Sequence, residues 1–230
     1  MSFDRFLKQR LPRAWFWFRF WKYRYTRKGE PEIRLIRKLV KPGSVAVDVG
    51  ASVGFYAAEM SRYASHVFAF EANPEVAEFA RKVATRKVEV FATALSSSRG
   101  GATLRVPLNR RDRVVTELAT LAASNALDGR PVVKVEVTKR CLDDFAIEGC
   151  RFIKIDVEGH EEDVIAGGWS LVSRDRPVLM VEMSDTFNPG VFGRLTASSP
   201  LWDTSRATCG TVRWFRPMIS PRCRTAMPTW

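Results

Sequence analysis

Residues Val45 to Tyr56, which read V-A-V-D-V-G-A-S-V-G-F-Y, constrain the fold of this chain more than any other stretch. A short apolar run rich in β-branched residues is typical of a buried parallel strand, and the glycines at positions 50 and 54 predict a tight turn into a helix. Such a turn allows close backbone approach, and the amide groups at the helix start face a crevice where nucleotides bind. The stretch lacks the G-x-G-x-x-G spacing of a dinucleotide site and the Lys-Ser/Thr of a phosphate loop, so alone it is also compatible with simple close packing.

Further strands and helices follow at the spacing of an α/β sheet. Glu71 ends the second apolar strand, 21 residues after Gly50, where an acidic group can bind both hydroxyls of a ribose. A helix is expected from Pro31 until just before Pro42. The remaining expectations are strands over 45–49, 67–71, 88–94, 152–157 and 177–182, an amphipathic helix over 114–127 and an edge strand over 132–137. The predicted fold class is therefore α/β, with a doubly wound, mostly parallel sheet.

Five motifs occur in order between Glu30 and Glu182. They read V-D-V-G-A-S-V-G-F-Y, F-E-A-N-P, A-L-S, C-L-D-D-F and F-I-K-I-D-V-E-G-H-E. Together they resemble the FkbM family of S-adenosylmethionine-dependent methyltransferases, and the resemblance is specific because all five lie at compatible spacings. It implies the Rossmann-like class I methyltransferase fold, S-adenosylmethionine as cofactor, and methylation of an oxygen atom.

The resemblance also implies which residues hold the cofactor. Asp48, Gly50 and Gly54 would shape the crevice, and Glu71 would hold the ribose. The full predicted cofactor-binding set is Asp48, Gly50, Ala51, Gly54, Phe55, Glu71, Asn73, Ala94, Leu95 and Asp156.

Ionisable residues cluster after the strand over 152–157. Asp156, Glu158 and His160 should gather near the crevice, because open parallel sheets bind ligands beyond the carboxyl ends of their strands. Helix capping also explains acids at a helix start, but an acid flanked by a second acid and a histidine favours function. With Glu182, which ends the next strand, these three form the predicted catalytic set, and Asp156 is the first candidate to position or accept a proton. No metal ligands are predicted, and a structural zinc site is not expected, since the four cysteines show no C-x-x-C spacing and the chain has only two histidines; the sequence leaves open whether a divalent metal joins the carboxylates.

The N-terminal region, residues 1–29, is unusual. Residues 1–28 hold ten aromatic residues and nine Lys or Arg. Three interpretations are open: packing of the rings on the domain or on a second subunit, contact with an anionic membrane surface, and nucleic-acid binding. Of the net charge of +12, residues 1–28 contribute +8 and residues 194–230 contribute +5, which leaves −1 for the body. A near-neutral body argues against a nucleic-acid partner.

The predicted methyltransferase domain covers 30–193, and residues 194–230 form a third region. That region contains six Arg, no Lys and four prolines, and it has no apolar run longer than two residues. We therefore expect an irregular or disordered tail and doubt the last strands that the family sheet requires. Without them the strand over 177–182 would expose an unpaired edge.

The predicted function is an S-adenosylmethionine-dependent O-methyltransferase that acts on a hydroxyl of a small molecule, such as a sugar or glycolipid precursor. One alternative is an NAD-binding oxidoreductase, which should show tighter glycine spacing. Another is a non-catalytic membrane- or RNA-binding protein, for which the N-terminal region is the evidence. The expected location is cytoplasmic, because no secretory segment is visible, with peripheral contact at the inner membrane face through residues 1–28 as an added interpretation. No oligomeric state is predicted.

Overall fold

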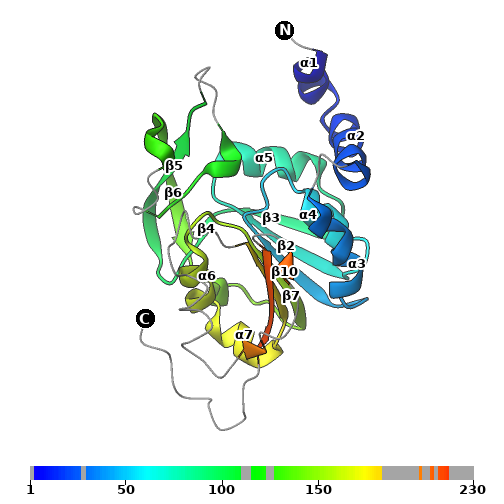
Figure 1. The fold of residues 1–230 in the computed structure, drawn as a ribbon, viewed down its shortest axis with the longest axis vertical. Helices are drawn as coiled ribbons and strands as arrows, with labels where there is room; N and C mark the ends of the chain where they lie inside the picture. The colour runs from blue at the N-terminus through cyan, green and yellow to red at the C-terminus, as the bar shows by residue number, and fades with distance from the viewer. Residues whose placement is uncertain are drawn as a thin grey trace.

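A β-sheet forms the centre of the computed structural model (Figure 1). The structure describes residues 3–26, 30–109, 115–122 and 127–182 and three short strands further on. Neighbours in this sheet follow the order β10-β11-β8-β7-β1-β2-β3, and β9 also pairs with β11. The strands are β1 (Val45–Val49), β2 (His66–Glu71), β3 (Val88–Ala92), β7 (Cys150–Ile155), β8 (Val178–Glu182), β9 (Trp202–Asp203), β10 (Thr208–Cys209) and β11 (Val212–Pro217). The five from β8 to β3 run parallel, which confirms the predicted fold class.

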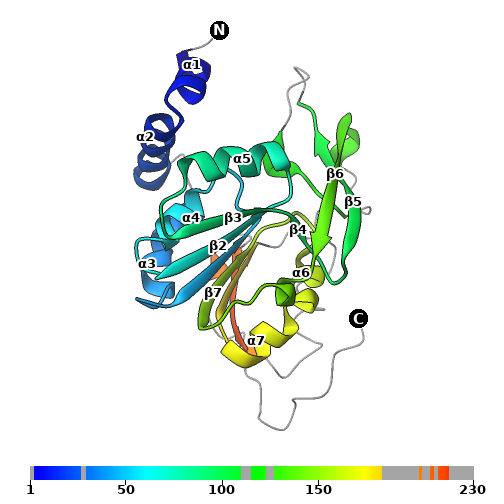
Figure 2. The same ribbon diagram turned by 180° about the vertical axis from the view of Figure 1, so that it is seen from behind.

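Helices cover both faces of this sheet because side chains alternate along each buried strand. Ala46 of β1 packs with α4 and α5, whereas its neighbour Val47 packs with α6 and α7. Figure 2 shows these two helical layers on opposite sides of the strands. The helices are α3 (Ile36–Leu39), α4 (Phe55–Met60), α5 (Pro74–Val83), α6 (Glu161–Gly167) and α7 (Trp169–Asp175), with the 3-10 turns η1 (Pro31–Leu35) and η4 (Leu142–Asp144). The helix predicted from Pro31 thus begins as a 3-10 turn and continues as α3.

Two N-terminal helices, α1 (Phe3–Arg10) and α2 (Pro12–Tyr25), lie over the α5 side of the sheet. Phe16 and Phe20 of α2 are buried, and both rings contact Phe55 of α4, with centroids 5.2 and 6.1 Å away. Arg24 forms a buried ion pair with Glu59, with Nε 2.9 Å from Oε2. Packing on the domain is therefore confirmed for one face of α2. Within the described residues, no helix has both the length and the apolar character needed to cross a membrane.

A smaller sheet has the order β4-β6-β5 and lies beside the carboxyl ends of the parallel strands. Its strands are β4 (Ala94–Leu95), β5 (Gly100–Pro107) and β6 (Val132–Arg140). The predicted edge strand over 132–137 exists as β6, but it pairs with β5, which the sequence did not predict, instead of joining the main sheet. The predicted helix over 114–127 is wrong in the described part, where Thr116–Leu118 forms a 3-10 turn (η2) and Thr120 pairs with Arg105. A further turn, η3, covers Leu127–Gly129.

The doubt about the C-terminal strands is also corrected. Strand β11 pairs antiparallel with β8, from Val212 opposite Glu182 to Phe215 opposite Leu179. The outer edge of β8 is therefore covered. This strand was difficult to predict because an antiparallel strand at a sheet edge forms its backbone hydrogen bonds without a long apolar run. Its sequence V-R-W-F does contain the β-branched and aromatic residues that favour strands. The predicted irregular or disordered tail over 194–230 otherwise lies outside the described residues.

Candidate active site

A cavity of about 330 Å³ opens at the carboxyl ends of the parallel strands, where the sheet topology predicts ligand binding. Its walls come from the turn after β1, the ends of β2, β7 and β8, strand β4, and the segment 116–121. Of the predicted cofactor residues, the structure brings Gly50, Ala51, Phe55, Glu71, Ala94, Leu95 and Asp156 together in this lining. Asp48, Gly54 and Asn73 are not part of the lining.

Gly50 starts the turn after β1 in a left-handed conformation, with φ +76°. A Cβ at this position would lie 1.8 Å from the carbonyl oxygen of Asp156. The neighbouring strand end therefore requires glycine here, whereas the predicted close approach of a ligand to Gly50 stays a prediction. The amides of Gly50 and Ala51 both donate to the Phe70 carbonyl, at 2.9 and 3.0 Å, and this fixes the turn against β2. Gly54 is also left-handed, with φ +94°, and begins α4.

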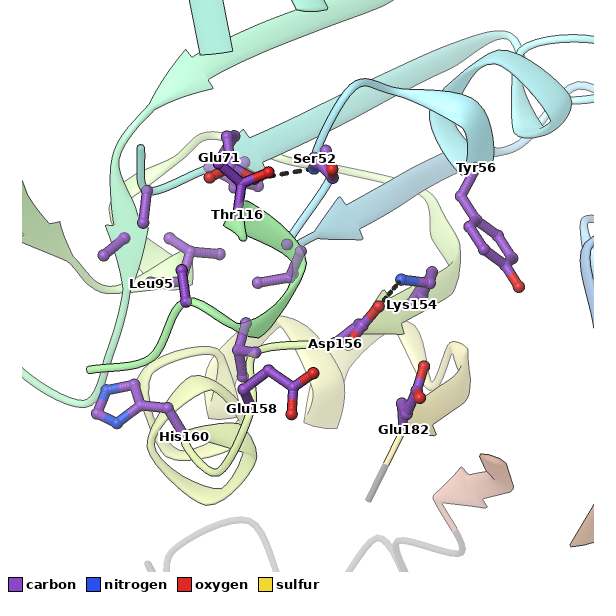
Figure 3. Close-up of a pocket in the computed structure, with 18 of the residues that line it drawn as sticks. Ser52, Tyr56, Glu71, Leu95, Thr116, Lys154, Asp156, Glu158, His160 and Glu182 are labelled. Atoms are coloured by element: carbon purple, nitrogen blue, oxygen red, sulfur yellow. Dashed lines mark hydrogen bonds and ion pairs between the residues drawn. The ribbon is translucent and has the colours of Figure 1, made fainter. Parts of the chain in front are cut away.

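Two backbone amides orient the cavity acid Glu71. Its Oε2 accepts a hydrogen bond from the Ser52 amide (Figure 3) and its Oε1 accepts one from the Asn73 amide, each at 2.8 Å. Burial raises the pKa of Glu71, and these two amides oppose the shift because they stabilise the charged form. The Asn73 side chain instead caps α5, since its Oδ1 accepts from the Glu75 amide at 3.0 Å. Asn73 thus positions Glu71 through its backbone.

Asp156 forms a pair with Lys154, with Oδ2 2.8 Å from Nζ. The Lys154 side chain is only 4% exposed, although it sits within an apolar strand. Burial alone lowers the pKa of Lys154, but the carboxylates of Asp156 and Asp48 outweigh it and raise that pKa. Asp48 lies opposite Lys154 in the strand register and is fully buried, and burial raises its pKa to about 6. Asp48 is therefore a buried acid beside Lys154, which lines the cavity, and does not line the cavity itself.

Two more predicted acids, Glu158 and Glu182, lie near this pair (Figure 3). Burial, followed by the charges of Asp156 and Glu182, raises the pKa of Glu158 to about 8. Burial and Asp156 raise the pKa of Glu182 to about 7. Burial and the neighbouring negative charges therefore keep a larger fraction of Glu158 and Glu182 protonated at neutral pH than of an exposed glutamate. Among the residues that the structure describes, no group of three His, Cys, Asp or Glu is placed to hold a metal ion.

His160 lines the cavity but faces other partners. Its Nε2 lies 3.0 Å from the Ser96 hydroxyl and its Nδ1 lies 3.3 Å from Asp163. Figure 3 shows the ring on the far side of Glu158 from the Lys154–Asp156 pair. Burial lowers the pKa of His160, against the influence of Asp163. This position suits a residue of the cavity wall better than a base acting beside Asp156.

Several cavity residues were not predicted. Lys154 had a visible signal, because a lysine inside the run F-I-K-I-D contradicts a buried strand unless a carboxylate pairs with it. Tyr56 and Glu30 form a hydrogen bond at 2.8 Å, and both line the cavity with Tyr23 of α2. Tyr23, Glu30 and Tyr56 come from three separate segments, and no local sequence pattern predicts that they meet in one cavity. The segment over 116–121 contributes further lining residues, namely Thr116, Leu118, Ala119 and Leu121.

The raised pKa values predict that stability falls as the pH rises. A glutamate of the unfolded chain titrates near 4.5, whereas folded Glu158 titrates near 8, so between these values the folded protein binds more protons than the unfolded chain. Its contribution to stability is therefore full below pH 4.5 and is lost as the pH rises towards 8. Urea denaturation at several pH values measures how the free energy of unfolding decreases as the pH rises. We expect Glu158→Gln to reduce the slope of this decrease, by at most about 1.4 kcal/mol per pH unit. Glu78→Gln, at an exposed position of α5, is the control, and equal slopes in the two variants would contradict the assignment.

This chain is similar to methyltransferases in sequence and in fold. The family model described as "Methyltransferase FkbM domain" matches residues 48–199. Hexuronic acid methyltransferase AglP of Haloferax volcanii is 29% identical over 157 residues, which are 64% of this chain and 59% of the relative, so the chain spans about three fifths of that protein. The crystal structure of methyltransferase FkbM from Methylobacillus flagellatus KT is similar with a TM-score of 0.50 and 18% identity, over 80% of this chain and 50% of that one. A SAM-dependent methyltransferase from Aquifex aeolicus has a TM-score of 0.43 and 16% identity, over 83% and 90% of the two chains.

Proposed function

Because the chain belongs to the methyltransferase FkbM domain family, we propose that it methylates a hydroxyl of a sugar or glycolipid precursor. Family membership supports methyltransferase activity, and S-adenosylmethionine is the methyl donor that we propose, as the resemblance in sequence implies. The acceptor and the role of each site residue are also part of the proposal. The observation that carries it is Glu71, an acid held by two backbone amides in the same cavity as the Asp156 group.

The residues of the cavity fit this cofactor. Glu71 would accept hydrogen bonds from the two ribose hydroxyls, since its own orientation is fixed by the Ser52 and Asn73 amides. The sulfonium of S-adenosylmethionine carries a positive charge, and the carboxylates of Asp156 and Glu182 favour a cation nearby. When bound, the cofactor supplies a methyl group that is already activated for transfer. The protein therefore has to align the acceptor and manage one proton.

Asp156 is the residue that we propose to hold the acceptor hydroxyl and to take its proton. The Lys154 ammonium, 2.8 Å from Oδ2, fixes the direction of the carboxylate. Glu158 is the second candidate. With a pKa of about 8 it is mostly protonated at neutral pH, so it would donate a hydrogen bond before it could act as a base.

A neutral sugar hydroxyl is the acceptor that the charges favour. The described lining includes the acids Glu30, Glu71, Asp156 and Glu182 and the mostly protonated Glu158, against Lys154 and His160. Their oxygens can accept hydrogen bonds from sugar hydroxyls, whereas the ionised acids would repel an acceptor that carries its own carboxylate. The relative named for hexuronic acid methylation supports a sugar as the class of acceptor. We therefore expect a neutral glycoside to be a better acceptor than the matching uronic acid.

Glu71→Ala tests the proposed cofactor site. Loss of charge-assisted hydrogen bonds to the ribose should weaken S-adenosylmethionine binding roughly 10- to 100-fold. Titration calorimetry with S-adenosylmethionine, S-adenosylhomocysteine and NAD measures this effect and also tests the oxidoreductase alternative. Glu75→Ala, at an exposed position of α5, is the matched control. Equal affinity of the two variants would remove Glu71 from the site, and tighter binding of NAD than of either sulfur compound would overturn the proposal.

A further inference from the structure

Helix α2 carries aromatic residues on two opposite faces. Phe16 and Phe20 are buried against the domain, as described above. Phe18, Trp21 and Tyr25 are 67%, 39% and 63% exposed. Their spacing of three and four residues places them on one face of the helix. The buried face accounts for the packing of α2, but it does not account for three large rings in contact with water.

This exposed face continues onto α1, and the same two helices carry exposed cations, of which Lys8 and Arg19 lie over the Trp15 ring and Arg13 donates to the Lys82 carbonyl. Phe6 and Leu11 are 47% and 56% exposed. The exposed basic side chains of the two helices are Lys8, Arg10, Arg13, Arg19 and Lys22. Scattered apolar residues are normal on a protein surface, but five of the six exposed large apolar side chains of the described residues lie on α1, α2 and the residue between them. We call Phe6, Leu11, Phe18, Trp21 and Tyr25, with these five cations, the N-terminal face.

We propose that the N-terminal face docks on an anionic membrane surface. Aromatic rings suit the depth of the lipid headgroups, and Lys and Arg are attracted to anionic lipids, so the two components of the face match the two components of such a surface. Figures 1 and 2 show α1 projecting away from the sheet, where a flat surface can reach it.

A membrane fits the charge distribution better than RNA does. Residues 29–193 have a net charge of −1, so the positive charge is not spread over the broad surface that a polyphosphate chain needs. Tyr23 places the acidic cavity directly beside α2, and the cavity carboxylates would repel a nearby phosphate chain. A planar bilayer would contact the face of α2 that lies opposite the buried Phe16 and Phe20. Docking does not depend on methyl transfer, and it would hold the cavity close to any acceptor carried by a lipid.

Vesicle binding of the full chain tests the inference. The probes are vesicles of phosphatidylcholine alone and of phosphatidylcholine with phosphatidylglycerol in equal parts, followed by sedimentation. One variant combines Phe18→Ser, Trp21→Ser and Tyr25→Ser, and a second combines Arg10→Gln, Arg19→Gln and Lys22→Gln. The control combines Arg37→Gln, Lys38→Gln and Lys41→Gln, which removes three exposed cations from another part of the chain.

We expect the wild type to bind the anionic vesicles, and each N-terminal variant to lose roughly 100-fold in affinity while the control retains it. S-adenosylmethionine binding should be unchanged in all variants, so a failure of the proposed function would appear there and not in the vesicle assay. Equal vesicle binding by the wild type and the aromatic variant would overturn the inference. Stronger binding to a single-stranded RNA oligonucleotide than to anionic vesicles, lost in the same variants, would also overturn it.

Discussion

Asp156→Asn is expected to lower turnover by about 10²- to 10⁴-fold while S-adenosylmethionine affinity changes little. The amide keeps the shape of the side chain but cannot take a proton from the acceptor hydroxyl. It also leaves the buried Lys154 ammonium without the negative charge that lies 2.8 Å from it in the wild type. Because the proposed role is at the reacting oxygen, the loss should appear in kcat and not in donor binding.

Single-turnover methylation of a neutral glycoside, with the donor affinity measured separately, checks this result. Asp163→Asn makes the same change of atoms at a carboxylate outside the described cavity lining, and it should retain most of the activity. Thermal unfolding of both variants shows whether the loss of the Lys154 partner has disturbed the fold. An Asp156→Asn protein that is folded and keeps more than about half of the wild-type rate would remove Asp156 from the catalytic role.

Gly50→Ala is expected to destabilise the protein by about 2–5 kcal/mol, the sum of backbone strain and steric overlap. The strain arises because φ is +76°, and the overlap arises because the new Cβ would lie 1.8 Å from the Asp156 carbonyl oxygen. Separating β1 from β7 at this point would also move Asp156, so activity should fall with stability. Urea denaturation, together with a donor titration of the folded fraction, measures both effects.

Gly149→Ala separates the two causes. Gly149 is also left-handed, with φ +66°, but a Cβ there would meet nothing within 4 Å. It should therefore cost only about 1–2 kcal/mol from strain. If the two variants were equally stable, contact with the Asp156 carbonyl would not be what requires glycine at position 50.

The parallel part of the fold could be predicted from sequence because its signals are local. The apolar run at Val45 and the glycine turn define β1 and the start of α4, and each later strand repeats the pattern. The same holds for Glu71 and Asp156, which follow strands whose carboxyl ends must meet at one edge of the sheet. The smaller sheet was less predictable, since β5 and β6 are exposed on one side and their pairing depends on a long connection.

The missed parts of the site depend on distant contacts. Lys154 could have been found, but Tyr23 and Glu30 reach the cavity from the N-terminal region, and no periodicity in sequence places them there. The motif predicts Asn73 as a cofactor residue, and the structure adds that its side chain caps α5. For α2, packing and a membrane surface were treated as competing interpretations. An amphipathic pattern cannot decide between them when both faces of one helix are aromatic.

The burial of α2 has a practical consequence for shortened versions of this protein. A chain that began at Glu30 would lose the Phe16 and Phe20 rings from the core and the Tyr23 wall from the cavity. It would also lose Arg24, the ion-pair partner 2.9 Å from the fully buried Glu59. Removing the basic, aromatic region to improve solubility would therefore remove part of the domain itself, and low activity of such a protein would say nothing about the activity of the chain that keeps residues 1–29.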